Sequence, residues 1–560
     1  MTWAQNYDPL GVGWLSVLLA AAPVVAMLGG LAFLRMRAPV AAIVGLVVAL
    51  LVATTTFGMP AGLAFRAAGF GAAYGLLPIG WIVLNIIFLY QLTEERGQFE
   101  ILRSSIARVT DDSRLQLLLV AFCFGAFFEG AAGFGTPVAV TGAMLIGLGF
   151  TRLQASGLSL IANTAPVAFG ALGTPLLTLS AITDLPLLDL SAMVGRQMTP
   201  FAFLVPWWML IAYCGWRRTL EIWPAVLVTS VVFAVTQLAI SNLHGPWLTA
   251  IGSALASIAA LVLFLRIWRP RRIMHVGEAR LSKHDERAIP DETAQPPGAV
   301  AAAADGRAVW KAWTPWLILT ATVFLWGIPA VKGALDGIFK PVIAVPGLDH
   351  VVLRTPPVVP VQEAEKAIYS LNLLSATGSA ILLAAIIGGL LLGAGPLQLA
   401  ATYGRALRKV APSLLTIAAM LALGHVTRYS GLDAAMGLAF ARTGMFYPFF
   451  GTLLGWLGVA VTGSDTASNV LFGGLQKITA TQLGISPTLM ASANSAGGVM
   501  GKMIDAQSIV VASTATRWFG AEGVILRYVF IHSIVLACLI GLVVTAMAYL
   551  PPFTRLVVGG

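Results

Sequence analysis

The chain has 560 residues, of which 58% are hydrophobic and 10% charged, and its mean hydropathy is +0.86. Soluble domains carry about 25% charged residues, so this composition excludes a soluble fold and predicts a protein of the lipid bilayer. The net charge is +10, from 34 basic and 24 acidic residues. The basic residues lie mostly between apolar stretches, as in cytoplasmic loops. The positive charge therefore indicates topology and not a nucleic-acid partner.

Apolar stretches of about 20 residues, the length that crosses roughly 30 Å of hydrocarbon, recur along the whole chain. They lie at 14–34, 41–56, 71–92, 115–128, 193–213, 225–240, 248–265, 316–331, 371–392, 412–426, 446–461 and 523–550. Other segments are too rich in glycine and polar residues to count cleanly. We expect an all-α polytopic membrane protein with about 12 to 14 membrane elements.

Loop charge predicts the orientation of these spans, because cytoplasmic loops concentrate Lys and Arg. The basic segments that we expect on the cytoplasmic side are 35–37, 96–114, 217–218, 266–287 and 405–409. The N-terminus then lies in the periplasm and, lacking a positively charged leader, is expected to remain in the mature protein. On this path span 71–92 runs inward and span 412–426 runs outward, which indicates inverted repeats.

Two polar regions separate the membrane segments. Residues 269–310, rich in charge and proline, are predicted to be a flexible cytoplasmic linker. It joins an N-terminal half, 1–268 with a repeat at about 70–215, to a C-terminal half, 311–560 with a repeat at about 405–550. Residues 332–367 are expected to form an extended outer loop, either a plain connector or a gate.

A short motif occurs in both halves. Ala162-Asn163-Thr164-Ala165 returns 331 residues later as Ala493-Asn494-Ser495-Ala496. Upstream of each copy lies another interrupted apolar segment, 129–135 and 462–469. Broken segments at corresponding places of two halves are typical of a transport site where repeats meet. We therefore expect broken helices or re-entrant hairpins around 163–166 and 494–498.

Glu129 breaks an apolar run in the first half. A charge at the bilayer centre costs roughly 2.5 to 3.5 kcal/mol, so it needs a partner or a function. The glycines after it, Gly130, Gly133 and Gly135, suggest that the helix stops there and lines a cavity. Glu129 is either a structural carboxylate bonded to free amides or a proton-binding or site-organising group, and we favour the second.

The second-half counterpart is richer in polar groups: Ser464, Asp465, Thr466 and Asn469. Asp465 is expected to be a helix N-cap, with capping alone as one explanation and proton binding as the other. A half-helix that starts here would present free N–H groups and a positive dipole end, which attract a small carboxylate.

Two cations lie near the predicted breaks. Lys502 precedes Asp505 by three residues, so it either forms an internal ion pair or binds an anionic substrate. Arg196 either binds a carboxylate through two N–H groups of its guanidinium or lies at the membrane interface. A lone His425 is expected to be a core group.

Metal and cofactor chemistry are not indicated. The six histidines are not paired at ligand spacing, and Cys123, Cys214 and Cys538 lie far apart in apolar segments. We therefore expect no metal, no cofactor and no enzyme activity, and no soluble segment is long enough for a receptor domain.

Several motifs together resemble the bacterial L-lactate permease family: 129–135, 163–170, 194–197, 462–466 and 497–504, with the opening 5–9. The resemblance extends to about residue 550. It implies proton-coupled uptake of L-lactate, D-lactate and glycolate across the bacterial inner membrane. A sodium-coupled or exchange-type carboxylate carrier is the alternative, and a homo-oligomer is left open.

The expected site combines Glu129 and Asp465 as proton carriers with a set of polar and glycine residues around the substrate. That set is Gly130, Gly133, Gly135, Asn163, Thr164, Arg196, Ser464, Thr466, Asn469, Asn494, Ser495, Lys502 and Gln507.

Overall fold

The computed structural model describes residues 2–32, 34, 36–107, 109–131, 133, 136–278, 306–518 and 521–559. Gly135 and most of the predicted linker 269–310 lie outside these residues. The helix α14 begins at Gly306, so the last residues assigned to the linker are helical.

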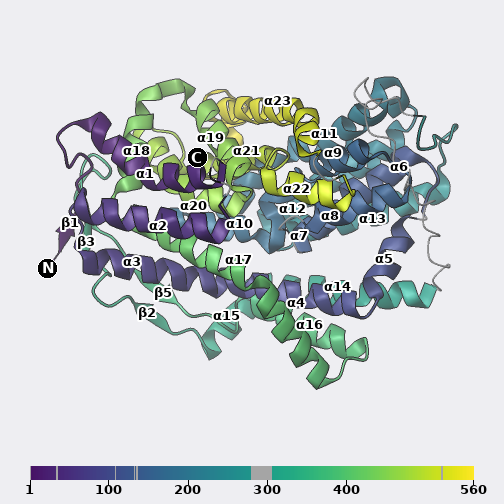
Figure 1. Ribbon diagram of the computed structural model, residues 1–560, viewed down its shortest axis with the longest axis horizontal. Helices are drawn as coiled ribbons and strands as arrows, with labels where there is room; N and C mark the ends of the chain where they lie inside the picture. Colours follow the sequence, from purple (N-terminus) through teal and green to yellow (C-terminus); the bar gives the residue numbers. More distant parts are fainter. Residues whose placement is uncertain are drawn as a thin grey trace.

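The first half is almost wholly helical (Figure 1). Its helices are α1 Gly13–Ala32, α2 Ala38–Thr55, α3 Ala61–Tyr74, α4 Trp81–Glu95, α5 Gln98–Ala107, α6 Ser113–Leu117, α7 Gly125–Ala131, α8 Thr136–Gly147, α9 Arg152–Ala162, α10 Gly170–Thr183, α11 Leu187–Leu220, α12 Trp223–Leu243 and α13 Thr249–Ile267. Short helical turns join some of them: η1 Gly75–Gly80, η2 Leu118–Phe124 and η3 Val167–Phe169.

The second half continues in the same way. Its helices are α14 Gly306–Gly327, α15 Pro329–Ile338, α16 Thr377–Leu391, α17 Pro396–Ser430, α18 Leu432–Phe440, α19 Tyr447–Thr462, α20 Asp465–Gln482, α21 Pro487–Gly501, α22 Ala506–Ala515 and α23 Glu522–Tyr549. The turn η5 Ala441–Phe446 joins α18 to α19, and η6 Phe553–Leu556 follows α23.

The helices confirm the predicted all-α polytopic membrane fold. Within the described residues, ten helical segments are long and apolar enough to cross a bilayer, and the bent pair Arg152–Ala162 and Val167–Thr183 would make eleven. Three shorter apolar helices add to them, Pro39–Thr55, Pro137–Gly147 and Thr377–Leu391. Apolar side chains on the outer helices remain exposed, as expected for a surface that faces lipid.

Short strands gather at one end of the molecule, where the chain begins (Figure 1, left). The strand β1 Trp3–Ala4 pairs in parallel with β3 Val352–Arg354, which pairs antiparallel with β4 Glu363–Ala364. A second ladder pairs β2 Val342–Ala344 with β5 Ile368–Ser370. Segment 332–367 is therefore not a simple extended loop: it begins inside α15, and its strands hold the start of the chain.

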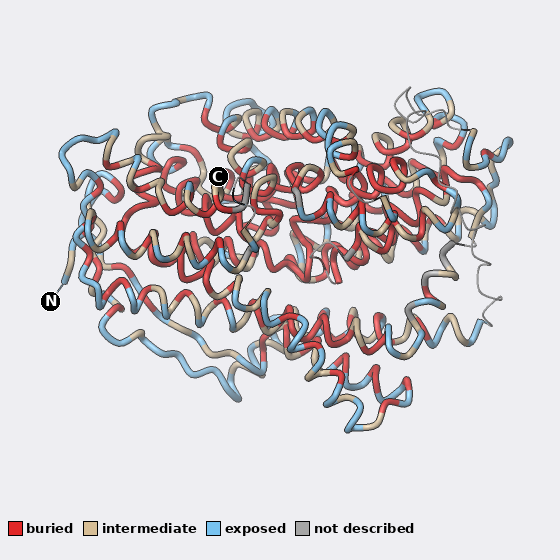
Figure 2. Tube along the Cα trace, viewed as in Figure 1, coloured by how far each residue is buried: buried red, intermediate tan, exposed pale blue. Residues whose placement is uncertain are grey.

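Burial is greatest where the broken segments of the two halves meet (Figure 2). Helices α19 and α21 approach closely there because small residues separate them. A Cβ added at Gly497 would lie 2.1 Å from the Thr452 carbonyl oxygen, and one at Gly455 would lie 2.0 Å from that of Asn494. These glycines fix the helices that carry the second-half polar residues.

We expect Gly497→Ala to lower the thermal unfolding midpoint of the purified protein in detergent, because overpacking of a filled interface costs typically about 1–3 kcal/mol. Gly404→Ala is the matched control, since an added Cβ at Gly404, also within a helix, meets nothing within 4 Å. That control is expected to keep or raise the midpoint. Equal midpoints for the two variants would contradict the close approach of α19 and α21.

Candidate functional site

Both predicted breaks of the first half are present. Helix α7 ends at Ala131, Gly133 has a φ of +58°, and α8 begins at Thr136. Helix α9 and the segment Val167–Thr183 are bent by 64°. At the start of that segment Ala171 and Leu172 have φ values of 43° and 54°, a region that L residues rarely adopt. Such strain is concentrated at functional sites.

In the second half, one break is confirmed and the other lies further along the chain. Helix α19 ends at Thr462, and the next residue, Gly463, has a φ of +72°, which is typical of a helix C-cap. The N-cap of α20 is Ser464, which accepts from the Ala467 N–H at 3.3 Å. The prediction that Asp465 is the N-cap was wrong by one position, because Asp465 is the first residue of α20.

The predicted break at 494–498 was wrong. Helix α21 continues through these residues to Gly501, because Asn494 makes its hydrogen bonds through its side chain and leaves the helix backbone intact. The chain breaks instead at 502–505. There Asp505 caps α22 by accepting from the Ser508 N–H at 2.7 Å.

Residues beside all four of these breaks surround one small cavity of about 70 Å³. Its walls come from both halves of the chain: Glu129, Gly133, Val167, Gly170, Ala171, Thr174, Pro175, Gly463, Ser464, Asp465, Thr466, Lys502 and Gln507. A single water needs roughly 10–15 Å³ by this kind of measure, so the space fits a few waters or one small organic ion.

Glu129 lies at the first-half wall with 4% of its surface exposed. The Asn163 side-chain amide donates to its Oε2 at 3.0 Å. Gly170 makes room for the other oxygen, since a Cβ there would lie 2.4 Å from Glu129 Oε1. Asn163 and Gly170, from the repeated motif, thus position the carboxylate.

Asp465 faces the cavity from the second half, also with 4% exposed. The Ser495 hydroxyl donates to its Oδ2. Its Oδ1 is buried and accepts no hydrogen bond from the described residues. One carboxylate oxygen therefore has hydrogen-bonding capacity left for a proton, a water or a ligand.

Lys502 supplies positive charge at the same wall, with 6% exposed. Its Nζ donates to the Gly463 carbonyl at 2.6 Å and lies 3.4 Å from Asp505 Oδ2. Of the two alternatives for Lys502, the internal ion pair is present, and the ammonium also borders the cavity. The lysine satisfies a carbonyl that the end of α19 leaves free.

The remaining predicted site residues that the structure describes divide into three groups. Gly133, Ser464, Thr466 and Gln507 line the cavity with the charged residues. Asn163 and Ser495 lie one hydrogen bond behind it.

Five other predicted residues have structural contacts elsewhere. Thr164 donates to the Ile161 carbonyl, and Asn469 donates to that of Pro175 at 3.1 Å. Asn494 is fully buried, and its side chain forms hydrogen bonds with Ser468, Asn469 and Gln476. Arg196 binds the Asn242 side chain and the Leu556 carbonyl, and a Cβ at Gly130 would lie 2.8 Å from Ile251 Cγ1 of α13. None of the five lines the cavity.

Sequence reasoning missed Thr174 and Pro175, which line the cavity from α10. A signal was available, since Pro175 follows a run with two glycines at 170 and 173. Thr174 also borders a second space of about 100 Å³, which reaches Ile79 beside α4 and Ser413 on α17. Ser464, Thr466 and Gln507 line both spaces, so the two adjoin.

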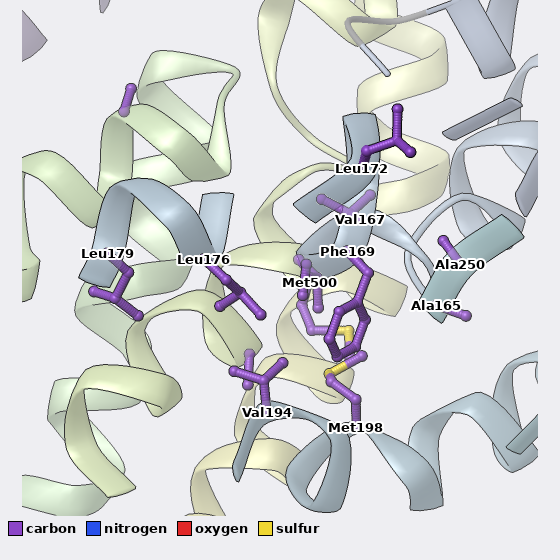
Figure 3. Close-up of a cluster of buried hydrophobic side chains, with 14 of the residues drawn as sticks. Ala165, Val167, Phe169, Leu172, Leu176, Leu179, Val194, Met198, Ala250 and Met500 are labelled. Atoms are coloured by element: carbon purple, nitrogen blue, oxygen red, sulfur yellow. The ribbon is translucent and has the colours of Figure 1, made fainter. Parts of the chain in front are cut away.

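A hydrophobic cluster holds the strained first-half segment in place (Figure 3). Phe169 points toward Met198 of α11 and Met500 of α21, and all three are buried. Thioethers pack favourably against aromatic rings. Side chains of both halves thus fix the chain between Asn163 and Thr174.

Within the described ranges, no three His, Cys, Asp or Glu side chains gather as ligands for a metal ion. Helices that suit a bilayer enclose a small polar cavity at the place where several of them break. These features define a multi-pass membrane transporter.

The chain belongs to the L-lactate permease family, whose model matches residues 16–551. It is 44% identical over 554 residues to an L-lactate permease of Salmonella typhi, covering 98% of each chain. It is 44% identical over 564 residues to a glycolate permease of Escherichia coli strain K12, covering 100% of both. Among solved structures, Neisseria gonorrhoeae MtrF aligns with a TM-score of 0.48 at 11% identity, over 94% of this chain and 97% of that one.

We expect Lys502→Met to lower the thermal unfolding midpoint in detergent, because removing one partner of a buried pair leaves the Asp505 charge uncompensated, at a cost of about 3–5 kcal/mol. The double variant Lys502→Met/Asp505→Asn should recover much of the loss, since asparagine keeps the cap of α22 without the charge. Additive losses in the two single variants and their combination would contradict the pair.

Proposed function

We propose that the protein is a proton-coupled symporter of small 2-hydroxymonocarboxylates, L-lactate, D-lactate and glycolate, that works by alternating access. The observation that supports this most directly is the meeting of Glu129, Asp465 and Lys502 at one small cavity built from both halves. Family membership supports the substrate class, because the relatives are named L-lactate and glycolate permeases.

Substrate recognition in this proposal uses the second-half wall. Lys502 and the start of α20, whose first N–H groups lack intrahelical acceptors, attract the carboxylate. Thr466 and Gln507 offer a hydroxyl and an amide at the same cavity for the substrate 2-hydroxyl. A cavity of about 70 Å³ favours a molecule with few heavy atoms.

Coupling to protons follows from the charges at the cavity. Two carboxylates, Glu129 and Asp465, line it with one ammonium, Lys502, which already pairs with Asp505. A substrate carboxylate adds a further negative charge, and like charges at short range in a poorly hydrated site repel strongly. Substrate and proton therefore bind together most readily, and this mutual dependence is the thermodynamic basis of symport.

Sodium coupling is the alternative, because unwound carbonyls at broken helices coordinate Na⁺ in some transporters. At the α19–α20 break, the Lys502 ammonium is bonded to the Gly463 carbonyl and lies beside Asp505. A tethered cation already occupies these oxygens, which favours protons as the coupling ion.

The proposed scaffold has two membrane halves, 1–268 and 311–560, joined by a cytoplasmic segment. It lies in the inner membrane, and its N-terminus faces the periplasm. Both α7–α10 and α19–α22 contain two chain breaks, an order compatible with inverted repeats. Alternating access would then move one broken-helix unit against the other around the cavity.

Uptake of labelled L-lactate into proteoliposomes, with a pH gradient or a sodium gradient imposed separately, tests the proposal. We expect accumulation with the inside alkaline and none above the background with sodium alone. Accumulation driven only by sodium would overturn proton coupling, and absence of uptake for L-lactate and glycolate under both gradients would overturn the proposed function.

We expect Glu129→Gln to abolish proton-driven accumulation of L-lactate and to retain exchange of labelled for unlabelled substrate. Glutamine has the size of glutamate and keeps an oxygen that accepts from the Asn163 amide, but it binds no proton. Uphill uptake and counterflow are measured in the same vesicles. Glu94→Gln, an exposed carboxylate at the end of α4, is the matched control and should behave as the unmodified protein. Unchanged uphill uptake in Glu129→Gln would exclude Glu129 as the proton carrier.

A further inference from the structure

A larger cavity of about 470 Å³ is lined in part by Ile368 and Ser370 of the strand β5. We call it the strand-end vestibule. Its walls include residues of α3, η1, α4, α10, α15, α17, the start of α16 and the segment between β4 and α16. None of its lining residues belongs to the lining of the cavity at Glu129, so the vestibule is a separate space.

The vestibule is rich in positive charge. Four cations line it, Lys332, Lys340, Lys366 and Arg428, against the single carboxylate of Asp184. Two of the cations are already engaged: Lys340 pairs with Asp336 at 2.9 Å, and Arg428 is bonded to Glu365.

The other two cations are available for a ligand. Within the described part of the chain, neither Lys332 nor Lys366 forms an ion pair with a carboxylate. Lys332 is half-buried, with its Nζ 5.9 Å from the centre of the Trp247 ring, and Lys366 is exposed. Asn372 and Thr377 add an amide and a hydroxyl to the lining. This combination of ammonium, amide and hydroxyl groups suits a small hydroxylated anion.

Helix α10 connects the vestibule with the inner cavity. Ala171 and Thr174 line the inner cavity, and Leu177, Ala181 and Asp184 line the vestibule. Thr174, Leu177 and Ala181 are spaced by three and four residues, which places them on one face of the helix. Ala171 lies in the left-handed turn before this face, and Asp184 is the C-cap that follows it. A single stripe of α10 therefore extends from one space to the other.

Helix α17, like α10, has residues in the lining of both spaces. Ile417 and Met420 border the space that adjoins the inner cavity, and Arg428 borders the vestibule. Apolar side chains border both spaces where α4 and α10 pass from one to the other: Ile82 and Leu177 line the vestibule, and Val83 lines the space of about 100 Å³ that adjoins the inner cavity. We call this apolar boundary the apolar partition.

We propose that the strand-end vestibule is a second, low-affinity binding site for small carboxylates, where Lys332 and Lys366 collect the anion before it crosses the apolar partition to the inner cavity. The inference rests on the proposed function for its substrate and on the proposed orientation for its direction, since it places the vestibule on the periplasmic side. A cleft lined by one sign of charge concentrates the opposite ion and raises its rate of entry by about 10- to 1,000-fold.

The test is L-lactate uptake by proteoliposomes that contain Lys332→Gln/Lys366→Gln. At low ionic strength we expect the apparent KM to rise about three- to tenfold, within the range of electrostatic steering, with an unchanged maximal rate. The difference should fade with added salt, because the Debye length shortens from about 30 Å at 0.01 M to about 8 Å at 0.15 M. A charge reversal, Lys332→Glu/Lys366→Glu, should raise KM further.

The matched control is Arg217→Gln/Arg271→Gln, which removes two exposed arginines. Their neighbours Arg218 and Arg272 accept from Arg114 of α6 through their carbonyls, and α6 lies at the right of Figure 1, away from β5. It should leave KM unchanged. Normal L-lactate uptake with identical KM and salt dependence in the lysine variants would overturn the vestibule site and leave the proposed function standing.

A second measurement does not depend on transport. Labelling of Lys366 by an amine-reactive reagent, followed by mass spectrometry of the detergent-solubilised protein, should slow in millimolar L-lactate. The neutral isostere lactamide should give no protection. Equal labelling rates with and without L-lactate would overturn the site even if uptake failed for another reason.

Discussion

The structure depends on one constraint: a helix that ends inside an apolar protein must find partners for the backbone groups it leaves unpaired, since each costs several kcal/mol away from water. The chain meets this constraint with its own polar atoms. Lys502 donates to the Gly463 carbonyl, Ser464 caps α20, and Asp505 caps α22. Lys502 and Ser464 also face the cavity. The same atoms therefore stabilise the breaks and set the charge and polarity of the site.

The two halves meet the constraint at different energetic cost. In the second half, the left-handed position at the end of α19 is a glycine, Gly463, which adopts it without penalty. In the first half, Ala171 and Leu172 occupy that region, at a cost of order 1–3 kcal/mol each. Packing of both halves around Phe169 offsets the cost (Figure 3). Because the strained residues lie beside Glu129 and Thr174, the strain is stored at the cavity wall.

Much of this arrangement was predictable from the sequence, because the membrane penalises charge and unpaired backbone so strongly that each exception stands out. Glu129, Asp465 and Lys502 were singled out in that way. The break beside Gly133 followed from a cluster of glycines, and the break beside Gly463 followed from the polar residues after it. The break near Asn494 was misplaced because the repeated motif suggested that both copies have the same backbone conformation. The Asn494 side chain instead forms hydrogen bonds with side chains of α20, and the helix continues through this residue. Arg196 could not be placed, since its partners, Asn242 and Leu556, are distant in the sequence.

The division of charge between the halves carries a mechanistic consequence. Glu129 comes from the first half, whereas Asp465 and Lys502 come from the second. In the proposed mechanism, any movement of one half against the other changes the distances among these three charges, so their electrostatic energy differs between the two access states. A proton and a substrate anion that bind among them alter that difference, because a ligand shifts a conformational equilibrium only by its differential affinity for the two states. The polar sites that close the broken helices thus become the groups through which binding biases the motion.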